Sequence, residues 1–222
     1  MKRNFDLPVL VVTLALAWPL SAHAQQSDAS VAEGKGAADL GQLRTMAEQG
    51  DPDAQFRLGE LYEQGEILER DLGKAIASYR KAAEQGHAGA QYALAHVYHL
   101  GNGVPQDMAT AMVWYRKAAL QGDEWSQLAL GDQYRIGLAV PRDVVQSTEW
   151  YRMAADQGNI FAQYELGNAY RYGNGVDKDL SQAIAWYRAS AAAGNPSANL
   201  ALTELGAGAA AGGTAPAPQT QP

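Results

Sequence analysis

The chain contains no cysteine, which removes disulfide bonds, thiolate metal ligands and cysteine nucleophiles together. Basic residues are also in the minority, because 17 Lys and Arg stand against 24 Asp and Glu and give a formal net charge of -7. Nucleic-acid binding needs a basic stripe that neutralises phosphates, so this acidic balance argues against it. Hydrophobic residues still make up 47% of the 222 residues. The composition therefore indicates a folded protein with a buried core and no covalent crosslinks.

The sequence also lacks a hydrophobic run long enough to span a membrane. Its longest apolar segment, Leu7 to Leu20, is shorter than the roughly 20 residues that a spanning helix needs, and Pro19 lies near its end. The positive charges of Lys2 and Arg3 precede this segment, and the sequence SAHA follows it. This is the pattern of a secretory signal peptide. We predict cleavage after Ala24 and a periplasmic or secreted mature chain, with an uncleaved anchor as the alternative.

Large apolar side chains are scarce at both ends of the mature chain. Residues 25–36 are small and polar, and residues 207–222 are almost entirely Ala, Gly, Pro, Gln and Thr. Such segments bury too little surface to offset the entropy of ordering. We therefore predict a flexible linker before the folded part and a disordered tail after it, with a tether or wall-spanning linker as the alternative role of the tail.

What the sequence does contain is a repeat with a period of 36 residues. The period relates Gly50, Gly86, Gly122, Gly158 and Gly194; Leu58, Leu94, Leu130, Leu166 and Leu202; Tyr62, Tyr98, Tyr134 and Tyr170; Asp71, Asp107, Asp143 and Asp179; and Tyr79, Tyr115, Tyr151 and Tyr187. No insertion interrupts this register. A fixed period of this length is typical of repeat proteins in which each unit is one supersecondary element.

Each unit is predicted to form two helices. Ala162, Leu166 and Tyr170 are spaced by four residues and so lie on one face of a first helix, which Gly173 ends. A second helix follows, and its own apolar stripe combines small and bulky side chains. Stacked pairs of this kind share a continuous core that a single pair lacks. The sequence therefore predicts an all-α, right-handed α-solenoid of stacked helix-turn-helix repeats.

The ends of the second helices carry recognisable capping residues. The periodic aspartates Asp71, Asp107, Asp143 and Asp179 are predicted N-caps, whose carboxylates accept backbone N–H groups. Gln146 and Gln182 stand three residues later, which predicts a weak capping box in repeats three and four. The glycine that closes each unit suits the left-handed conformation beyond a helix C-terminus.

These signals predict the following organisation of the chain. Residues 1–24 form the signal peptide, 25–36 the linker, 37–50 a half repeat, 51–86, 87–122, 123–158 and 159–194 four full repeats, 195–206 a second half repeat and 207–222 the tail.

The repeat resembles the Sel-1-like repeat, a relative of the tetratricopeptide repeat. Its pattern is A-x-x-x-L-G-x-x-Y-x-x-G-x-G-V-x-x-D-x-x-x-A-x-x-W-Y-x-x-A-A-x-x-G, which Ala162 to Gly194 follow almost throughout. The resemblance covers about Ala37 to Gly206 and implies a scaffold that binds other proteins, often in envelope signalling, secretion, polysaccharide export or host contact. Repeat one departs from the pattern with Ser78 and the sequence GEIL, and repeat three with Ser147 and GLAV. Activities of the cysteine-rich secreted branch are not carried over, because this chain has no cysteine.

One pair of residues matches a catalytic motif. Ser78 and Lys81 spell S-x-x-K, the nucleophile motif of penicillin-recognising enzymes, but no K-T-G sequence accompanies it. The other repeats hold a tryptophan at the position of Ser78, namely Trp114, Trp150 and Trp186. We interpret the serine as a repeat variant and predict no catalytic residues.

Two histidines form the one pattern that could bind a metal. His96 and His99 lie three residues apart on a first helix, where Glu60 or Asp132 of a neighbouring helix could join them. The sequence fixes no third ligand, so we interpret both histidines either as binding-surface residues or as residues that are simply exposed to solvent. We predict no metal and no other cofactor.

The resemblance also implies where a partner binds. In tetratricopeptide solenoids the first helices line the concave face, and their residues at i, i+3, i+7 and i+10 are expected here to be free of the core. This stripe runs from an acidic end in repeat one to an aromatic, Arg-bearing end in repeats three and four, and aromatic and Arg residues dominate interface energies. The predicted partner-binding residues are Trp125, Arg135, Phe161, Arg171, Tyr164, Tyr92, His96 and His99.

The sequence therefore favours an exported, non-catalytic scaffold that binds a protein partner in envelope signalling, secretion or host interaction. A ligand-binding or hydrolytic module acting on cell-wall material or β-lactams is the first alternative. A purely structural spacer is the second.

Overall fold

The computed structural model describes residues 36–208, with side chains from Asp39 onward, and this part of the chain forms ten helices and no strands. The helices are α2 (Gly36–Glu48), α3 (Pro52–Gln64), α4 (Leu72–Glu84), α5 (Ala88–Leu100), α6 (Met108–Ala119), α7 (Glu124–Ile136), α8 (Val144–Asp156), α9 (Ile160–Tyr172), α10 (Leu180–Ala192) and α11 (Pro196–Glu204). The all-α solenoid is confirmed. The predicted signal peptide and linker, and the tail beyond residue 208, lie outside the described residues.

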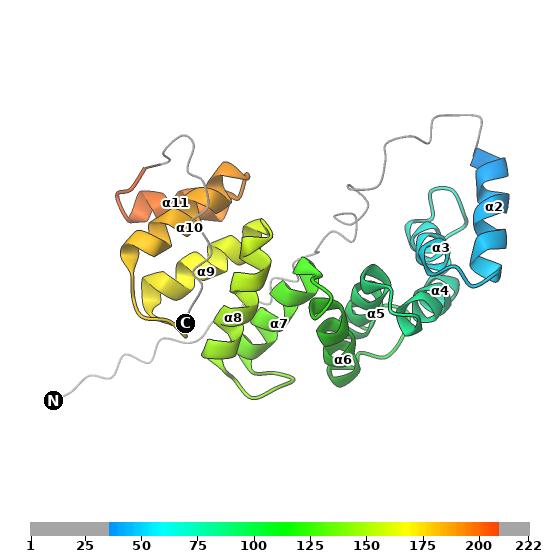
Figure 1. Cartoon of the computed structure of the whole chain (residues 1–222), viewed down its shortest axis with the longest axis horizontal. Coiled ribbons are helices and arrows are strands. Elements are labelled where there is room, and N and C mark those ends of the chain that lie inside the picture. The colour runs from blue at the N-terminus through cyan, green and yellow to red at the C-terminus, as the bar shows by residue number, and fades with distance from the viewer. Residues whose placement is uncertain (1–35, 209–222) are drawn as a thin grey trace.

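The helices stack in pairs that follow one another along an arc (Figure 1). Each full repeat contributes one pair, α3 with α4, α5 with α6, α7 with α8 and α9 with α10. The first helix of each pair lies toward the inner, concave side of the arc and the second toward the outer side (Figure 1). Helix α2 packs on α3 and α11 packs on α10, so a single helix lies against each terminal repeat. None of the helices in residues 36–208 is long and apolar enough to cross a membrane.

The N-caps predicted for the second helices are confirmed. The carboxylate of Asp71 accepts the backbone N–H of Lys74 at 2.9 Å, and the three equivalent aspartates do the same in their repeats. The predicted capping box is wrong in repeat three: it needs the Gln146 side-chain oxygen to accept the Asp143 backbone N–H, whereas the Gln146 amide donates to the Asp143 carboxylate at 3.0 Å. The reason is that the Asp143 N–H already donates to the carbonyl of Tyr134 at 2.8 Å, so the residue needs no second partner there.

The closing glycines have a positive φ as predicted, and the residue after each of them caps the next first helix. Gly122 has φ 96°, a conformation that side-chain-bearing residues rarely adopt, and the other four closing glycines lie between 96° and 99°. The caps that follow them are Asp51, His87, Asp123, Asn159 and Asn195. A short polar residue after glycine therefore starts each first helix, although His87 fills this role with a ring nitrogen.

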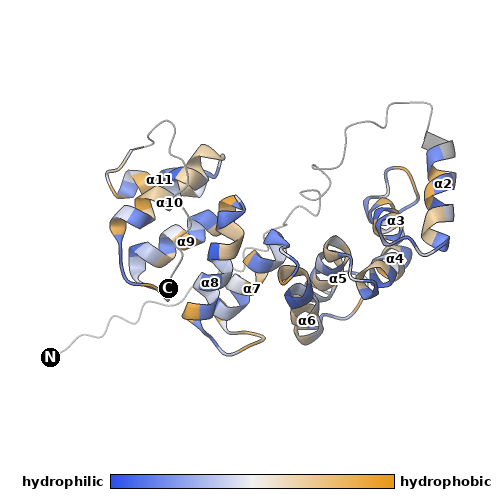
Figure 2. Cartoon of the chain, in the orientation of Figure 1, coloured by the Kyte–Doolittle hydropathy of each residue, from blue (hydrophilic) through white to orange (hydrophobic). Residues whose placement is uncertain are grey.

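The core is built from the periodic leucines and tyrosines. Leu94, Leu130, Leu166 and Leu202 have no exposed surface, and Tyr79, Tyr115, Tyr151 and Tyr187 are at most 2% exposed. Each such tyrosine lies against a small residue of the first helix: a Cβ added to Gly131 would come within 2.5 Å of the Tyr151 ring. Repeat two holds Ala95 at that position. Every helix mixes hydrophobic and hydrophilic residues along its ribbon, as expected for elements with one buried face (Figure 2).

Buried glutamines join successive repeats through their amides. The Gln91 side chain donates to the Ala83 carbonyl at 3.1 Å and accepts from Gln121 at 2.7 Å, so it ties the end of α4 to the end of α6. Gln55 and Gln127 make the same two bonds in repeats one and three. Repeat four keeps only the first bond, from Gln163 to Ala155, because Ala193 stands where a glutamine would donate. We name this series the glutamine relay.

Candidate functional site

Four pairs of polar residues line the inner side of the solenoid at a spacing of 36. Each pair is separated by three residues on a first helix, so both members face the same way. We name them the inner row: Glu60 and Glu63, His96 and His99, Asp132 and Arg135, and Asn168 and Arg171. The scaffold around the row is repetitive, whereas the row itself differs in every repeat.

A tyrosine hydroxyl of the second helix contacts the inner row in each repeat. Tyr79 Oη donates to the Glu63 carboxylate at 2.6 Å, and Tyr151 Oη donates to Asp132 at 2.7 Å while accepting from Arg135 at 2.9 Å. The same contact joins Tyr115 to His99 at 3.2 Å and Tyr187 to Asn168 at 2.7 Å. The inner row is therefore held in place by buried side chains, which reduces the entropy lost when a partner binds.

Burial sets the protonation of several inner-row groups. It lowers the pKa of His96 to about 4, with the neighbouring His99 adding to the effect, and it also lowers the pKa of His99. Both imidazoles are therefore neutral at pH 7. Burial raises the pKa of Glu63, although the hydrogen bond from Tyr79 and the charge of Arg70 oppose the change.

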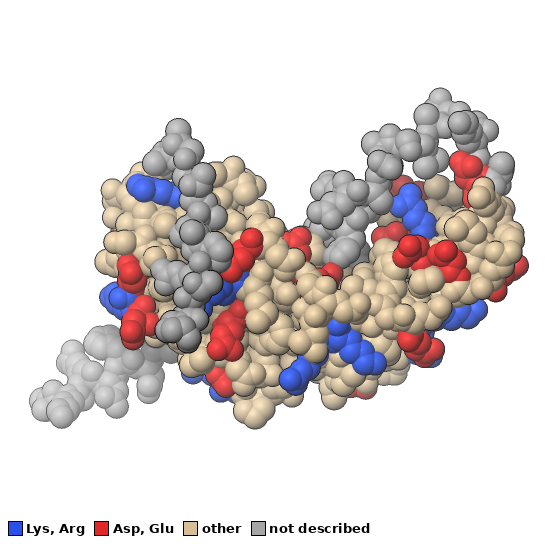
Figure 3. Space-filling view, in the orientation of Figure 1, with Lys and Arg blue, Asp and Glu red and all other residues tan. Residues whose placement is uncertain are grey.

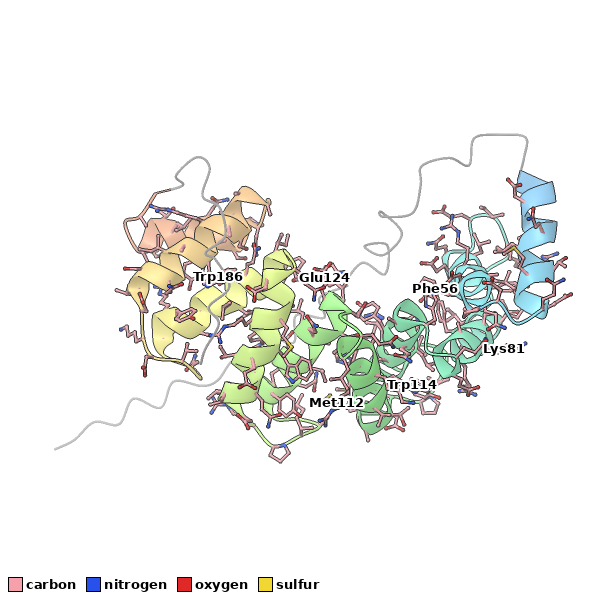
Figure 4. All side chains as sticks on the ribbon, viewed as in Figure 1. Phe56, Lys81, Met112, Trp114, Glu124 and Trp186 are labelled. Carbon is pink, nitrogen blue, oxygen red and sulfur yellow. The ribbon has the colours of Figure 1, made fainter. Side chains whose placement is uncertain are left out.

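The two faces of the solenoid differ in charge. The inner helices α3, α5, α7 and α9 carry six acidic and three basic residues, whereas the outer helices α4, α6, α8 and α10 carry three acidic and seven basic residues. Acidic side chains gather along the inner edge of the arc, and several basic side chains lie on its outer edge (Figure 3). Glu124 lies at the inner edge and Lys81 at the outer one (Figure 4).

Four of the predicted partner-binding residues reach the surface. The side chain of Arg135 is 46% exposed and pairs with Asp132 at 2.9 Å, whereas that of Arg171 is 20% exposed and bonds to Glu204 of α11 at 3.0 Å. Phe161 is 36% exposed, and its ring centre lies 6.0 Å from that of half-buried Trp125. The structure thus brings the two aromatic rings together across the boundary between repeats three and four.

The other predicted residues are more deeply placed. Tyr92 is 2% exposed, with its ring 6.0 Å from that of Tyr115, and His96 is 8% exposed. Tyr164 and His99 are half-buried. The expectation that the whole stripe is free of the core is therefore wrong at the i+3 position, because this position faces the core tyrosine of the same repeat. It is also wrong at the i+7 position of repeat two, where the His96 ring stacks on that of Tyr92 with the ring centres 6.0 Å apart. Partner binding by these residues stays a prediction.

The contact between the core tyrosines and the inner row is a feature that the sequence reasoning missed. In the sequence these tyrosines stand out only as a periodic position of the second helices, which names no partner for their hydroxyls. The signal that could have found the contact is the shared period, since Tyr151 and Arg135 recur with their equivalents at a constant separation of 16 residues.

Two patterns in the sequence could have chemical roles, the S-x-x-K sequence of Ser78 and Lys81 and the histidine pair. Ser78 is half-buried in the middle of α4, and Lys81 is exposed in the last turn of that helix. In residues 36–208, no three His, Cys, Asp or Glu side chains come close enough together to hold a metal ion.

The decisive comparison is with protein-family models. The model described as the Sel1 repeat matches residues 52–87, 88–123, 126–159 and 160–195, which is more than half of the sequence. The chain belongs to the Sel1 repeat family. Sel1 repeat proteins generally mediate protein–protein interactions and are in general non-enzymatic scaffolds. No curated protein sequence matches the chain.

Solved Sel1 repeat structures resemble the solenoid over most of its length. A protective antigen of uropathogenic Escherichia coli strains is 42% identical, with a TM-score of 0.72 over 75% of this chain and 36% of the antigen. A Sel1 repeat protein from Oxalobacter formigenes is 38% identical, with a TM-score of 0.71 over 75% of this chain and 48% of that protein. An immunity protein of Pseudomonas aeruginosa shares the fold alone, at 23% identity and a TM-score of 0.51 over 84% of this chain and 69% of that protein. The chain thus matches less than half the length of the first two proteins.

Proposed function

We propose that this Sel1 repeat protein is an exported, non-catalytic scaffold that binds a protein partner along the inner face of its solenoid. The observation that carries the proposal is the inner row: a different polar pair occupies the same place in each repeat, against the same tyrosine hydroxyl. A repeated frame that presents different side chains in each repeat can favour one partner over another, because specificity is a difference between affinities.

The best candidates for partner anchors lie in repeats three and four. Trp125 and Phe161 form a partly exposed aromatic pair, and Arg135 is the more exposed of the two inner-row arginines. Aromatic and Arg residues carry most of the binding energy in protein interfaces. Because the inner helices are acidic on balance, we expect the partner segment to be basic where it lies along repeat one.

Site-specific photocrosslinking in cells tests this surface. A photoreactive amino acid replaces Phe161 in one variant, and in the matched control it replaces Leu120, which is 71% exposed and follows the outer helix α6. We expect one dominant crosslinked protein from the Phe161 position and none from the Leu120 position. Products from Leu120 alone would place the partner on the outer face and reject the inner-face proposal.

A binding measurement with the identified partner then ranks the anchors. Replacing Trp125, Arg135, Phe161 and Arg171 together with Ala should leave the helical circular-dichroism spectrum intact and weaken binding by at least about a hundredfold, the loss of roughly 2.7 kcal/mol typical of one or two anchors. Equal affinity of a folded quadruple variant would contradict the assignment of these anchors.

The role in envelope signalling, secretion or host interaction depends on export. We expect the protein purified from the periplasm or the medium to begin at Gln25, which intact-mass measurement detects. A protein that retains its first 24 residues would support the anchored alternative.

A further inference from the structure

The outer face of repeats one and two carries exposed side chains that the inner-face proposal does not use. Along α6, Val113, Lys117 and Leu120 are spaced by four and then three residues, so they share one face of the helix. Val113 is 54% exposed and Leu120 is 71% exposed, so two large apolar side chains stand in solvent beside a cation. We name the cationic ridge, which comprises these three residues, Arg116 of the same helix, and Arg80 and Lys81 of α4.

The four cations of the ridge are not neutralised by the fold. Within the described part of the chain, none of them forms an ion pair. Arg80 donates to the hydroxyl of Tyr98 at 2.8 Å, and the Lys117 ammonium lies 4.0 Å from the ring centre of half-buried Trp114. Both of these groups are uncharged. Glu84 is the single acidic residue within α4 and α6, so the ridge presents an excess of positive charge to solvent.

The repeats show that the solenoid does not need this ridge in order to fold. At the three positions of Val113, Lys117 and Leu120, repeat three holds Glu149, Met153 and Asp156, and repeat four holds Ala185, Ala189 and Ala192. The same helix pair therefore forms with acidic, apolar or small side chains at these places. Because packing does not require the residues of the ridge, their combination of cations with exposed apolar groups points to binding.

The negative net charge of the protein does not cancel the ridge. Two layers of helices, each about 10 Å across, lie between the ridge and the acidic inner edge of the arc (Figure 1). The Debye length at physiological salt is about 8 Å, so charges on the inner edge are largely screened at the outer face. A binding partner at the outer face of repeats one and two therefore meets mainly positive charge.

We propose that the cationic ridge docks on an anionic phospholipid surface, with its four cations over the lipid phosphates and with Val113 and Leu120 among the headgroups. A basic helix face that also carries large apolar side chains is typical of helices that lie in a membrane interface. A hydrophilic polyanion would pair with the cations but leave both apolar side chains in water. Docking by the convex side also leaves the inner face directed away from the lipid, where a protein partner can reach it (Figure 1).

Co-sedimentation with lipid vesicles tests the proposal. The purified protein begins at Gln25, because the apolar segment Leu7–Leu20 would itself bind lipid. Vesicles made of equal parts phosphatidylglycerol and phosphatidylcholine are compared with vesicles of phosphatidylcholine alone. We expect binding to the anionic vesicles to be at least about tenfold tighter and to weaken as salt is added, because the attraction is between charges.

The charge of the ridge is tested by the variant Lys81→Met with Lys117→Met, which introduces the residue of repeat three, Met153. Each basic residue near an anionic surface strengthens binding by about fivefold, so this variant should bind the anionic vesicles at least about tenfold more weakly. The matched control is Arg44→Met with Lys178→Met, which removes two exposed cations that lie outside the ridge. We expect the control to bind as the natural protein does.

The apolar part of the ridge is tested by the variant Val113→Ala with Leu120→Ala, which introduces the residues Ala185 and Ala192 of repeat four. This variant keeps every charge. It should still bind the anionic vesicles at least about fivefold more weakly, because less apolar surface leaves water on docking. Circular dichroism and urea unfolding establish that each variant is folded before its binding is compared.

Several results would overturn the proposal. One is a failure to bind anionic vesicles, and another is equal binding to both kinds of vesicle. Equal losses in the ridge and control charge variants would place the lipid contact elsewhere, and full binding by the folded alanine variant would mean that only charge is recognised. A protein crosslinked from Leu120 without any vesicle binding would assign the ridge to an acidic protein instead. Crosslinking from Phe161 stays an independent result, because none of these variants changes the inner face.

Discussion

At the scale of single residues, the period supplies its own controls, because each side chain has equivalents in other repeats. Leu130 has no exposed surface and lies in the central part of the solenoid. We expect Leu130→Ala to lower the free energy of unfolding by about 2–5 kcal/mol, as large-to-small changes in cores do. Chemical denaturation measures the loss, with Leu200→Ala, at a position 63% exposed, as the control. Similar losses in both variants would contradict the described core.

His96 makes stability depend on pH. Burial lowers its pKa from 6.5 to about 4, so the unfolded chain takes up a proton before the folded chain does. The folded state is therefore fully favoured above pH 6.5 and loses stability as the pH falls from about 6.5 to about 4, by up to roughly 3 kcal/mol for this group.

The matched variant is His96→Asn, because Asn168 occupies the equivalent position in repeat four. Urea unfolding between pH 7 and about 4 should show a steeper loss in the natural protein than in the variant. Parallel curves would mean that His96 titrates normally in the folded state.

At the scale of helices, the ends are set by short local signals. Asp179 accepts the backbone N–H groups of Ser181 at 2.8 Å and Gln182 at 3.0 Å, so it satisfies two groups that the helix itself leaves open. We expect Asp179→Ala to lower the free energy of unfolding by about 0.5–2 kcal/mol. Asp177→Ala, in the exposed loop before it, controls for the loss of one negative charge. An equal effect of the two changes, measured by chemical denaturation, would show that charge and not capping is responsible.

Such signals explain how much of the fold the sequence could predict. Period, caps and closing glycines depend on neighbours along the chain, so the order and the approximate bounds of the helices could be derived from them. The depth of Tyr92 could not, because α5 is apolar on nearly every side and its sequence does not say which stripe meets Tyr115. The pairing of Trp125 with Phe161 needed the structure too, since these residues lie on α7 and α9 and only the packing of the two helices brings their rings together.

At the scale of the whole molecule, a solenoid lets its ends open separately from its middle, because each repeat contacts only its neighbours. Leu202 is as fully buried as Leu130, but among the described helices its own helix α11 packs chiefly on α10. We expect Leu202→Ala to cost less than Leu130→Ala and to speed amide hydrogen exchange in α10 and α11 while α5 to α8 keep their protection. Uniform loss of protection would mean that the ten helices open as one cooperative unit.

The glutamine relay has a consequence for how such a chain can change in length over generations. A gene that loses or duplicates 36 codons in frame leaves every relay bond with an equivalent partner: without residues 87–122, the Gln127 side chain meets the carbonyl of Ala83 in place of Ala119. We expect this deletion variant to remain helical and to unfold cooperatively in urea, at a lower midpoint because Ser78 leaves a gap where Trp114 packed. Adding Ser78→Trp should recover part of the midpoint, and a deletion variant without a cooperative transition would contradict the expectation. In-frame mutation can therefore shorten or lengthen the inner face by whole repeats. Each new boundary between repeats then keeps the hydrogen bonds of the glutamine relay.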